Sequence, residues 1–303
     1  MHPADPTFCD LPAATLETLG DAQVAILGAA HGTPYNPGVP SHSAGAPAAL
    51  RSTLEWYDTR RDHIDMDRGE PLMGATRAVD IGDADTNPDD TGAANRAAIA
   101  QAVAAVRAQG AVPILLGGDD SVPIPFFEGF AGENVWIVQV DAHIDWRDEV
   151  EGVTHGFSST MRRASEMDQI QGIVQIGARG MGSARAGEVE VARNWGAKLF
   201  PMRQIHAEGL GSALEAVPEG ANIILTTDVD GLDPALCPAA LSAEFGGIGY
   251  QQMLDIIEGC GARGRIVGAT MIEFVPERDP HGLAAKAVAR ILCNLIAEIG
   301  AGG

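Results

Sequence analysis

The stretch VWIVQVDAHIDW (135–146) predicts the fold. An apolar run ends at Asp141, and a segment follows in which carboxylates and an imidazole alternate with apolar residues. A run that is apolar on both faces is typical of a strand in a covered parallel sheet. In such sheets, ligands bind beyond the carboxyl ends of the strands. The stretch therefore predicts a buried strand that ends at a polar site.

Similar runs rich in valine and isoleucine recur along the chain, at 23–28, 77–82, 112–118, 172–177, 222–228 and 265–274. Helices are predicted over 91–110, 249–264 and 283–300, whereas the Gly-, Pro- and Asp-rich segments 29–47 and 57–76 are predicted loops. Strands alternating with helices indicate a doubly wound α/β fold. Because the sequence contains no repeat, low-complexity segment or linker, we interpret residues 1–303 as a single domain.

The composition limits the classes of molecule that the protein is expected to bind. With 41 acidic and 20 basic residues, the formal net charge is −21, which repels phosphate backbones and tolerates cations. No apolar run is long enough to span a bilayer, and no signal peptide opens the chain. Four scattered cysteines without a CxxC motif are typical of a reducing compartment. We expect a cytoplasmic protein that binds neither nucleic acid nor membrane.

Carboxylates follow directly after three of the predicted strands, in GGDDS (117–121), DAHID (141–145) and DVDGLDP (228–234). In an extended chain, alternate residues point the same way, so DAHID and DVD would each present their polar side chains on one face. Taken singly, such an Asp is a turn former or a helix cap, and a lone His is structural. Taken together, converging carboxylates repel one another unless cations lie between them. The pattern therefore predicts two divalent ions, and oxygen-rich ligation with one imidazole favours Mn²⁺.

These three segments resemble, in order and spacing, the signature segments of the ureohydrolase family, which includes arginase, agmatinase, guanidinobutyrase and formimidoylglutamase. Further segments, 35–51, 154–164 and 271–279, resemble its substrate loop, its His-Gly loop and its late Glu-x-x-Pro segment. The resemblance covers most of the chain. It implies a three-layer α/β/α fold around an eight-stranded, mostly parallel sheet. It also implies a binuclear Mn²⁺ centre (Ni²⁺ as the alternative), urea release from a guanidino compound, and a homo-oligomer, either trimer or hexamer.

The resemblance also implies a set of metal ligands. The family's first signature usually reads Gly-Gly-Asp-His-Ser and its His is a ligand, whereas this chain has Asp120 at that position. A carboxylate oxygen of Asp lies about as far from the backbone as the nearer ring nitrogen of His, and it suits hard ions. The replacement adds one negative charge to the site. Asp119 would hold the Gly-Gly turn. Carried over by position, one ion is held by Asp120, Asp141, Asp145 and Asp228, and the other by His143, Asp141, Asp228 and Asp230.

Three residues receive catalytic roles from the resemblance. Asp145 would accept a proton from the attacking water and pass it to the leaving amine, and His155 would act as a proton shuttle. Glu273 would pair with the substrate's guanidinium group. The alternatives are a loop residue without a role for His155 and a surface ion pair for Glu273.

The substrate is less constrained by the sequence. Arginases have an Asn before the His-Gly pair, but this chain reads GVTHG (152–156), which disfavours arginine. We therefore predict an agmatinase-like, metal-dependent amidinohydrolase with a small cationic guanidino substrate, agmatine or a guanidino acid. Arg162 and Arg163 either meet a substrate carboxylate or pair with Glu166 or Asp168, and His31 and His42 could contact the ligand.

Three rival functions remain open. One is a hydrolase of the same fold that acts on a formimino compound or a small guanidine, and another is a catalytically silent subunit that binds metal or ligand. The third is a nucleotide-binding protein, which the sequence supports poorly because LGGDDS (116–121) lacks the G-x-G-x-x-G spacing.

Overall fold

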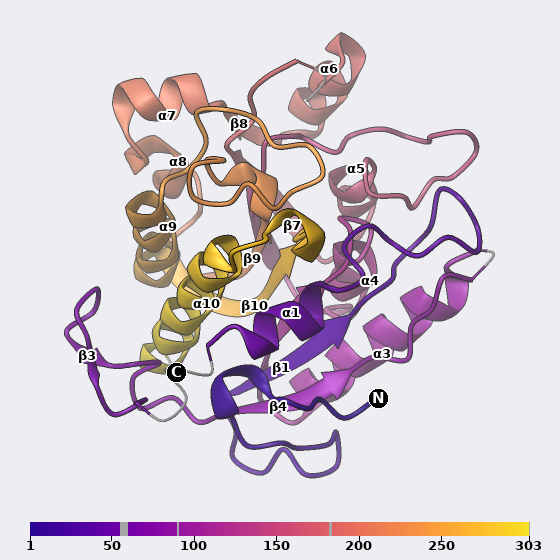
Figure 1. Ribbon diagram of the computed structural model, residues 1–303. Coiled ribbons are helices and arrows are strands. Elements are labelled where there is room, and N and C mark those ends of the chain that lie inside the picture. Colours follow the sequence, from indigo (N-terminus) through magenta and orange to yellow (C-terminus); the bar gives the residue numbers. More distant parts are fainter. Residues whose placement is uncertain (55–59, 90, 182–183, 303) are drawn as a thin grey trace.

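The computed structural model describes residues 1–54, 60–89, 91–181 and 184–302. Its central feature is one eight-stranded sheet, which helices flank in Figure 1. The strand order is β4-β1-β5-β10-β9-β6-β7-β8, and every neighbouring pair is parallel. The bounds are β1 Val24–Ala29, β4 Ala78–Asp83, β5 Val112–Gly117, β6 Val135–Val140, β7 Ile170–Ile176, β8 Lys198–Phe200, β9 Ala221–Asp228 and β10 Gly264–Ile272.

Helices cover both faces of this sheet, which gives three layers. The first face carries α1 Ala46–Ser52, α7 Met202–Glu208, α8 Gly211–Glu215, α9 Tyr250–Arg263 and α10 Leu283–Ala301. The second face carries α3 Ala93–Ala108, α4 Pro123–Glu128, α5 Thr160–Ala164 and α6 Ala186–Trp195. Strand residues alternate between the two cores, as Val24 does with Ala25. Burial on both faces explains why the strands read as continuous apolar runs.

The predicted strands and helices are confirmed, with bounds that differ by one or two residues at either end. The eighth strand, β8, has only three residues, which is too short for an apolar run to stand out in the sequence. The expected loop at 57–76 contains a small antiparallel hairpin of β2 Ile64–Asp65 and β3 Glu70–Pro71, and its residues 57–59 lie outside the described part. The described part of the chain also contains three short 3-10 helices: η1 Phe8–Asp10, η2 Val229–Gly231 and η3 Pro276–Arg278.

The order of the central strands places the polar segments together. β5, β10, β9 and β6 are consecutive neighbours, so their carboxyl ends meet at one edge of the sheet. The segments that follow these four strands begin at Gly118, Glu273, Val229 and Asp141. Among the described residues, no helix combines the length and the apolar character needed to cross a membrane.

Candidate metal centre

The Gly-Gly pair after β5 allows the chain to turn within a crowded space. A Cβ atom on Gly118 would lie 2.2 Å from the carbonyl oxygen of Ala30, which is closer than any side chain tolerates. The two aspartates that follow are both buried and have different surroundings. Asp119 Oδ1 accepts hydrogen bonds from the backbone N–H of Ser121, at 3.1 Å, and from its hydroxyl group. Asp119 therefore fixes the turn.

Asp120 has no such partners. Both of its carboxylate oxygens are buried without a hydrogen-bond partner in the structure. Burial, together with the charges of Asp145 and Asp141, raises the pKa of Asp120 well above its usual range. A buried carboxylate without partners is costly, so native structures supply it with a hydrogen bond or a cation. Asp120 is therefore suited to bind a cation.

The DAHID segment brings its polar side chains together, but not as an extended strand. β6 ends at Val140, and Asp145 has a positive φ of 52°, which is uncommon for an amino acid other than glycine. The turn is held by the Asp141 carboxylate, whose Oδ1 accepts the N–H of His143 at 2.6 Å. The expectation that strand alternation aligns these side chains is therefore wrong. The chain bends at Ala142 and His143 instead, and Asp141 and Asp145 nevertheless offer ligand atoms to the same group.

The DVD segment differs from the expected strand in a similar way. Asp228 is the last residue of β9, and η2 begins directly after it. Asp228 caps this helical turn by accepting the N–H of Asp230 at 2.7 Å. Asp230 in turn reaches across to the neighbouring loop, where its Oδ1 accepts the N–H of Ala142 at 3.1 Å. This bond joins the ends of β9 and β6.

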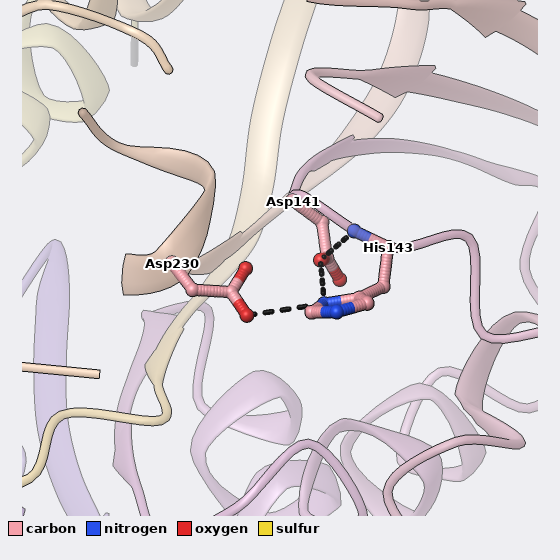
Figure 2. A group of neighbouring side chains, drawn as sticks. All are labelled: Asp141, His143 and Asp230. Carbon is pink, nitrogen blue, oxygen red and sulfur yellow. Dashed lines mark hydrogen bonds and ion pairs between the residues drawn. The ribbon is translucent and has the colours of Figure 1, made fainter. Parts of the chain in front are cut away.

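His143 faces two of these carboxylates, as Figure 2 shows. Its Nδ1 lies 3.1 Å from Asp230 Oδ2 and 3.4 Å from Asp141 Oδ1. Burial disfavours a charged imidazole, but the hydrogen bond to Asp230 and the surrounding negative charges outweigh it and raise the pKa of His143 to about 9. The imidazole thus occupies a place between carboxylates where a cation is favoured.

Two groups of ligand atoms could each hold a metal ion. Asp120, Asp141 and Asp145 form one group, and the atoms they offer lie within 4.8 Å of one another. Asp141, His143 and Asp230 form the second group by the same measure. Asp141 belongs to both groups and would lie between the two ions.

Asp228 lies against both groups. It is buried, and burial followed by the charges of Asp230 and Asp141 raises its pKa well above the usual range. The pKa of Asp141 is raised for the same kinds of reason, burial first and then Asp145 and Asp230. Carboxylates that crowd in this way cannot all ionise without compensating cations. Oxygen donors with one imidazole match hard or borderline divalent ions such as Mn²⁺.

A pocket of about 320 Å³ opens onto this cluster. We refer to the carboxylates of the cluster, Glu273 and His143 as the base of this pocket, and to its other lining residues as its walls. The lining residues are Asp120, His143, Asp145, Asp228, Asp230 and Glu273 with Trp146, Arg147, Phe157, Ser158, Met181, Glu188, Leu241 and Ser242. Arg147 and Glu188 form an ion pair on the wall, with Arg147 Nε 3.6 Å from Glu188 Oε1. The pocket therefore combines a negative base with one cation beside one anion on its wall.

Glu273 lies in the base of the pocket, directly after β10. Its Oε1 accepts the N–H of Asp120 at 2.9 Å, which ties it to the metal cluster. Its Oε2 contacts Nε2 of His42, whose ring lies edge-on to Phe157. Burial raises the pKa of Glu273, although the contact with His42 opposes this shift. His42, which the sequence placed only in a substrate-side loop, thus contacts the residue expected to bind the guanidinium group.

The other candidates from the sequence lie farther from the base. His155 is not among the described residues that line the pocket, and its Nδ1 lies 2.8 Å from the hydroxyl of Thr154. Burial and the positive charges of Arg96 and Arg163 lower the pKa of His155. His31 lines a neighbouring pocket of about 290 Å³, which Phe157 and His42 share.

Arg162 and Arg163 are engaged with acidic neighbours. Both pair with Asp148 and with Glu166, at distances between 2.6 and 3.5 Å. The interpretation of these arginines as partners of nearby acids is therefore confirmed for Glu166, and Asp148 takes the place expected for Asp168.

Sequence reasoning missed two polar side chains inside the sheet. Gln139 precedes Asp141 by two residues on β6 and donates hydrogen bonds to two carboxylates of the cluster, and Gln175 lies beside it on β7. A glutamine within an otherwise apolar strand, two residues before a ligand, was the signal available in VWIVQVD (135–141).

Comparisons with known proteins agree with this geometry. A family model described as the arginase family matches residues 22–297. A guanidinobutyrase from Pseudomonas aeruginosa is 30% identical over 241 residues, covering 76% of this chain and 75% of that protein. A mitochondrial agmatinase from Gallus gallus is 29% identical over 230 residues, covering 72% and 65%. Among solved structures, proclavaminate amidino hydrolase from Streptomyces clavuligerus has a TM-score of 0.83 at 22% identity, covering 100% of this chain and 98% of the other, which shows a shared fold.

Proposed function

We propose that this chain, which belongs to the arginase family, hydrolyses a linear guanidino compound, agmatine or a guanidino acid, to urea and an amine. Membership makes it a ureohydrolase, a metal-dependent amidinohydrolase that acts on guanidino compounds. The observation that carries the finer proposal is the cluster of carboxylates and one imidazole at the base of a pocket, with the Asp120 oxygens left without partners.

The residues present fit two divalent ions. One ion would be held by Asp120, Asp141, Asp145 and Asp228, and the other by His143, Asp141, Asp228 and Asp230, with Mn²⁺ the favoured metal. The two groups of ligand atoms that share Asp141 support this assignment. When bound, the ions would supply an acidified water as nucleophile and a Lewis acid for the guanidinium carbon.

The side chains of the pocket can do the rest of the chemistry. Glu273 lies beside the cluster, where its carboxylate would orient the substrate by accepting guanidinium N–H groups. Asp145 lines the same base and would take a proton from the attacking water and return it to the leaving nitrogen. His155 stays a predicted proton shuttle. The walls around Trp146 and Leu241 leave room for a chain beyond the guanidinium group.

The test is a screen for urea release over a set of guanidino compounds, with Mn²⁺ and Ni²⁺ supplied in parallel. We expect Mn²⁺-dependent urea release from agmatine or from 4-guanidinobutyrate. Formamide release from a formimino compound would instead support the rival hydrolase of the same fold. Absence of any metal-dependent hydrolysis, with metal bound, would support a silent subunit.

The cellular setting is part of the proposal. We propose a cytoplasmic homo-oligomer, a trimer or a hexamer. All four cysteines are buried, unpaired thiols, which agrees with a reducing compartment.

A further inference from the structure

Two buried glutamines lie behind the cluster of carboxylates. Gln139 on β6 and Gln175 on β7 face each other in register, and their exposed fractions are only 1% and 2%. Uncharged amides are rare inside parallel sheets, because every N–H and C=O must find a partner there. These amides lie on the face of the sheet that carries α3, α4, α5 and α6, as the neighbouring Ile137 and Ile173 do.

The two amides form a directed chain of hydrogen bonds. The indole N–H of Trp146 donates to Gln175 Oε1 at 2.7 Å. The Gln175 amide nitrogen donates to the carbonyl of Ile144, at 2.9 Å, and to Gln139 Oε1. The Gln139 amide nitrogen then donates to Asp141 Oδ2 at 2.6 Å and to Asp145 Oδ2 at 3.1 Å. Each N–H group of both amides is therefore used.

The direction of this chain is fixed at its far end. An indole N–H can only donate, and a backbone carbonyl can only accept. Between Trp146 and the carbonyl of Ile144, Gln175 has one favourable orientation, with its oxygen toward the indole. Its N–H then faces Gln139, which must turn its own oxygen to Gln175 and both N–H groups to the carboxylates. A reversed Gln139 would place its oxygen against two negative charges.

We propose that Gln139 is a positioning residue for the metal centre, and that Trp146 and Gln175 set its orientation. Its amide holds one oxygen of Asp141 and one of Asp145, two of the three residues in the group that includes Asp120. The other oxygen of each carboxylate would then be available to a shared ion. The two N–H groups also offset part of the negative charge that four carboxylates concentrate there. This inference rests on the proposed binuclear site.

A second polar pair in the same sheet provides a matched control. Thr226 on β9 is the neighbour of Gln139 in register, is equally buried, and shares a hydrogen bond of 2.6 Å with the hydroxyl of Thr270. No contact of its side chain with a ligand carboxylate is present among the described residues. Thr226→Val and Gln139→Met each replace a buried polar group at the same level of the sheet, but only the second removes a bond to the metal centre.

The experiment measures Mn²⁺ binding to the full chain by calorimetry, the spectrum of the bound ions by electron paramagnetic resonance, and the thermal unfolding of the metal-free protein. We expect Gln139→Met to weaken Mn²⁺ binding by about 10–100-fold, the usual effect of losing a partner of metal ligands, and to change the spectrum. Thr226→Val should bind Mn²⁺ within about twofold of the wild type, a change smaller than the loss of one hydrogen bond would cause. Without metal, Gln139→Met should lose more thermal stability than Thr226→Val, because it removes three hydrogen bonds and Thr226→Val removes one.

Mn²⁺ binding by Gln139→Met that equals that of Thr226→Val would overturn the inference while leaving the proposed function in place. A wild type that binds no Mn²⁺ would overturn both. If Gln139→Met does not fold, Trp146→Phe asks the same question, because it removes the fixed donor and keeps both amides. Trp146→Phe should weaken Mn²⁺ binding about threefold or more, which corresponds to the loss of one hydrogen bond. Unchanged Mn²⁺ binding would contradict the role of the hydrogen-bond chain in positioning the ligands.

Discussion

Asp119 and Asp120 are adjacent carboxylates with different environments. The difference distinguishes the structural role of Asp119 from the ligand role proposed for Asp120. Asp119 is satisfied by Ser121 within its own turn, whereas both oxygens of Asp120 are buried and unpartnered. Neighbouring residues of the same type therefore cannot be assigned from sequence alone. The resemblance to ureohydrolases indicated that Asp120 would be the ligand and that Asp119 would hold the turn.

His155 gives the first prediction at the scale of single residues. It lies two residues before Phe157, which lines the pocket, and burial together with Arg96 and Arg163 lowers its pKa, which favours a neutral imidazole that can accept a proton. We expect His155→Ala to slow turnover by about 10²-fold, as loss of a general acid or base does, and to keep its metal. Turnover and metal content of the same preparation check this. Loss of metal would make His155 a ligand, and unchanged turnover would remove it from the mechanism.

Arg147 gives a prediction about substrate choice. Its side chain lines the pocket that also contains the carboxylate cluster. It forms an ion pair with Glu188, in which Arg147 Nε lies 3.6 Å from Glu188 Oε1. A substrate carboxylate would compete with Glu188 for this guanidinium group, at a gain of about 1.5–3 kcal/mol for a charge-assisted bond. Arg147→Gln should therefore raise KM for 4-guanidinobutyrate about 10-fold or more and leave KM for agmatine nearly unchanged. Equal changes for both compounds would show that Arg147 does not select the substrate.

At the scale of elements, the strands were predictable and the segments after them were not. Runs that are apolar on both faces identified the seven longer strands, because both faces of the sheet are covered by helices. The turn at Asp145 and the 3-10 helix after Asp228 escaped prediction, since they depend on hydrogen bonds between loops, such as Asp230 to Ala142. Gln139 escaped because its role depends on Gln175, its neighbour in space and not in sequence.

The Gly-Gly turn after β5 gives a prediction at this scale. A Cβ on Gly118 would meet the Ala30 carbonyl at 2.2 Å, so Gly118→Ala must displace the backbone that carries Asp120. We expect a loss of about 1–3 kcal/mol in the free energy of unfolding, together with weaker Mn²⁺ binding. Gly187→Ala in α6 is the control, because its new Cβ would meet no described atom within 4 Å apart from its chain neighbours and its own helix backbone. Denaturant unfolding and Mn²⁺ titration of both variants check this, and Gly118→Ala matching Gly187→Ala in both would contradict it.

At the scale of the whole molecule, the concentration of negative charge in one interior site links stability to pH. Asp120, Asp141 and Asp228 have pKa values raised by burial and by one another, and the pKa of His143 is raised to about 9. Without metal, the folded chain therefore keeps protons that the unfolded chain has lost. The stability that these groups contribute to the metal-free protein therefore falls as pH rises above about 4, where unfolded carboxyl groups ionise.

Bound metal reverses this dependence, because the ligands must lose their protons on binding, and Mn²⁺ affinity therefore rises with pH. We expect the increase in Tm that Mn²⁺ gives, relative to a chelator, to be larger at pH 8 than at pH 5. Thermal unfolding at both pH values, with and without Mn²⁺, measures it. If Mn²⁺ raised Tm equally at both pH values, or more at pH 5, these carboxyl groups would not be the ligands of the ion.

Metal stoichiometry tests the central claim most directly. Elemental analysis after dialysis against saturating Mn²⁺ should find two ions per chain in the wild type and in Asp119→Asn, since Asp119 Oδ1 is taken up by Ser121. Asp120→Ala should keep one tightly held ion, because the second group of ligand atoms, around His143, does not include Asp120. A wild type that binds fewer than two ions, or an Asp120→Ala variant that holds two as tightly as the wild type, would contradict the account.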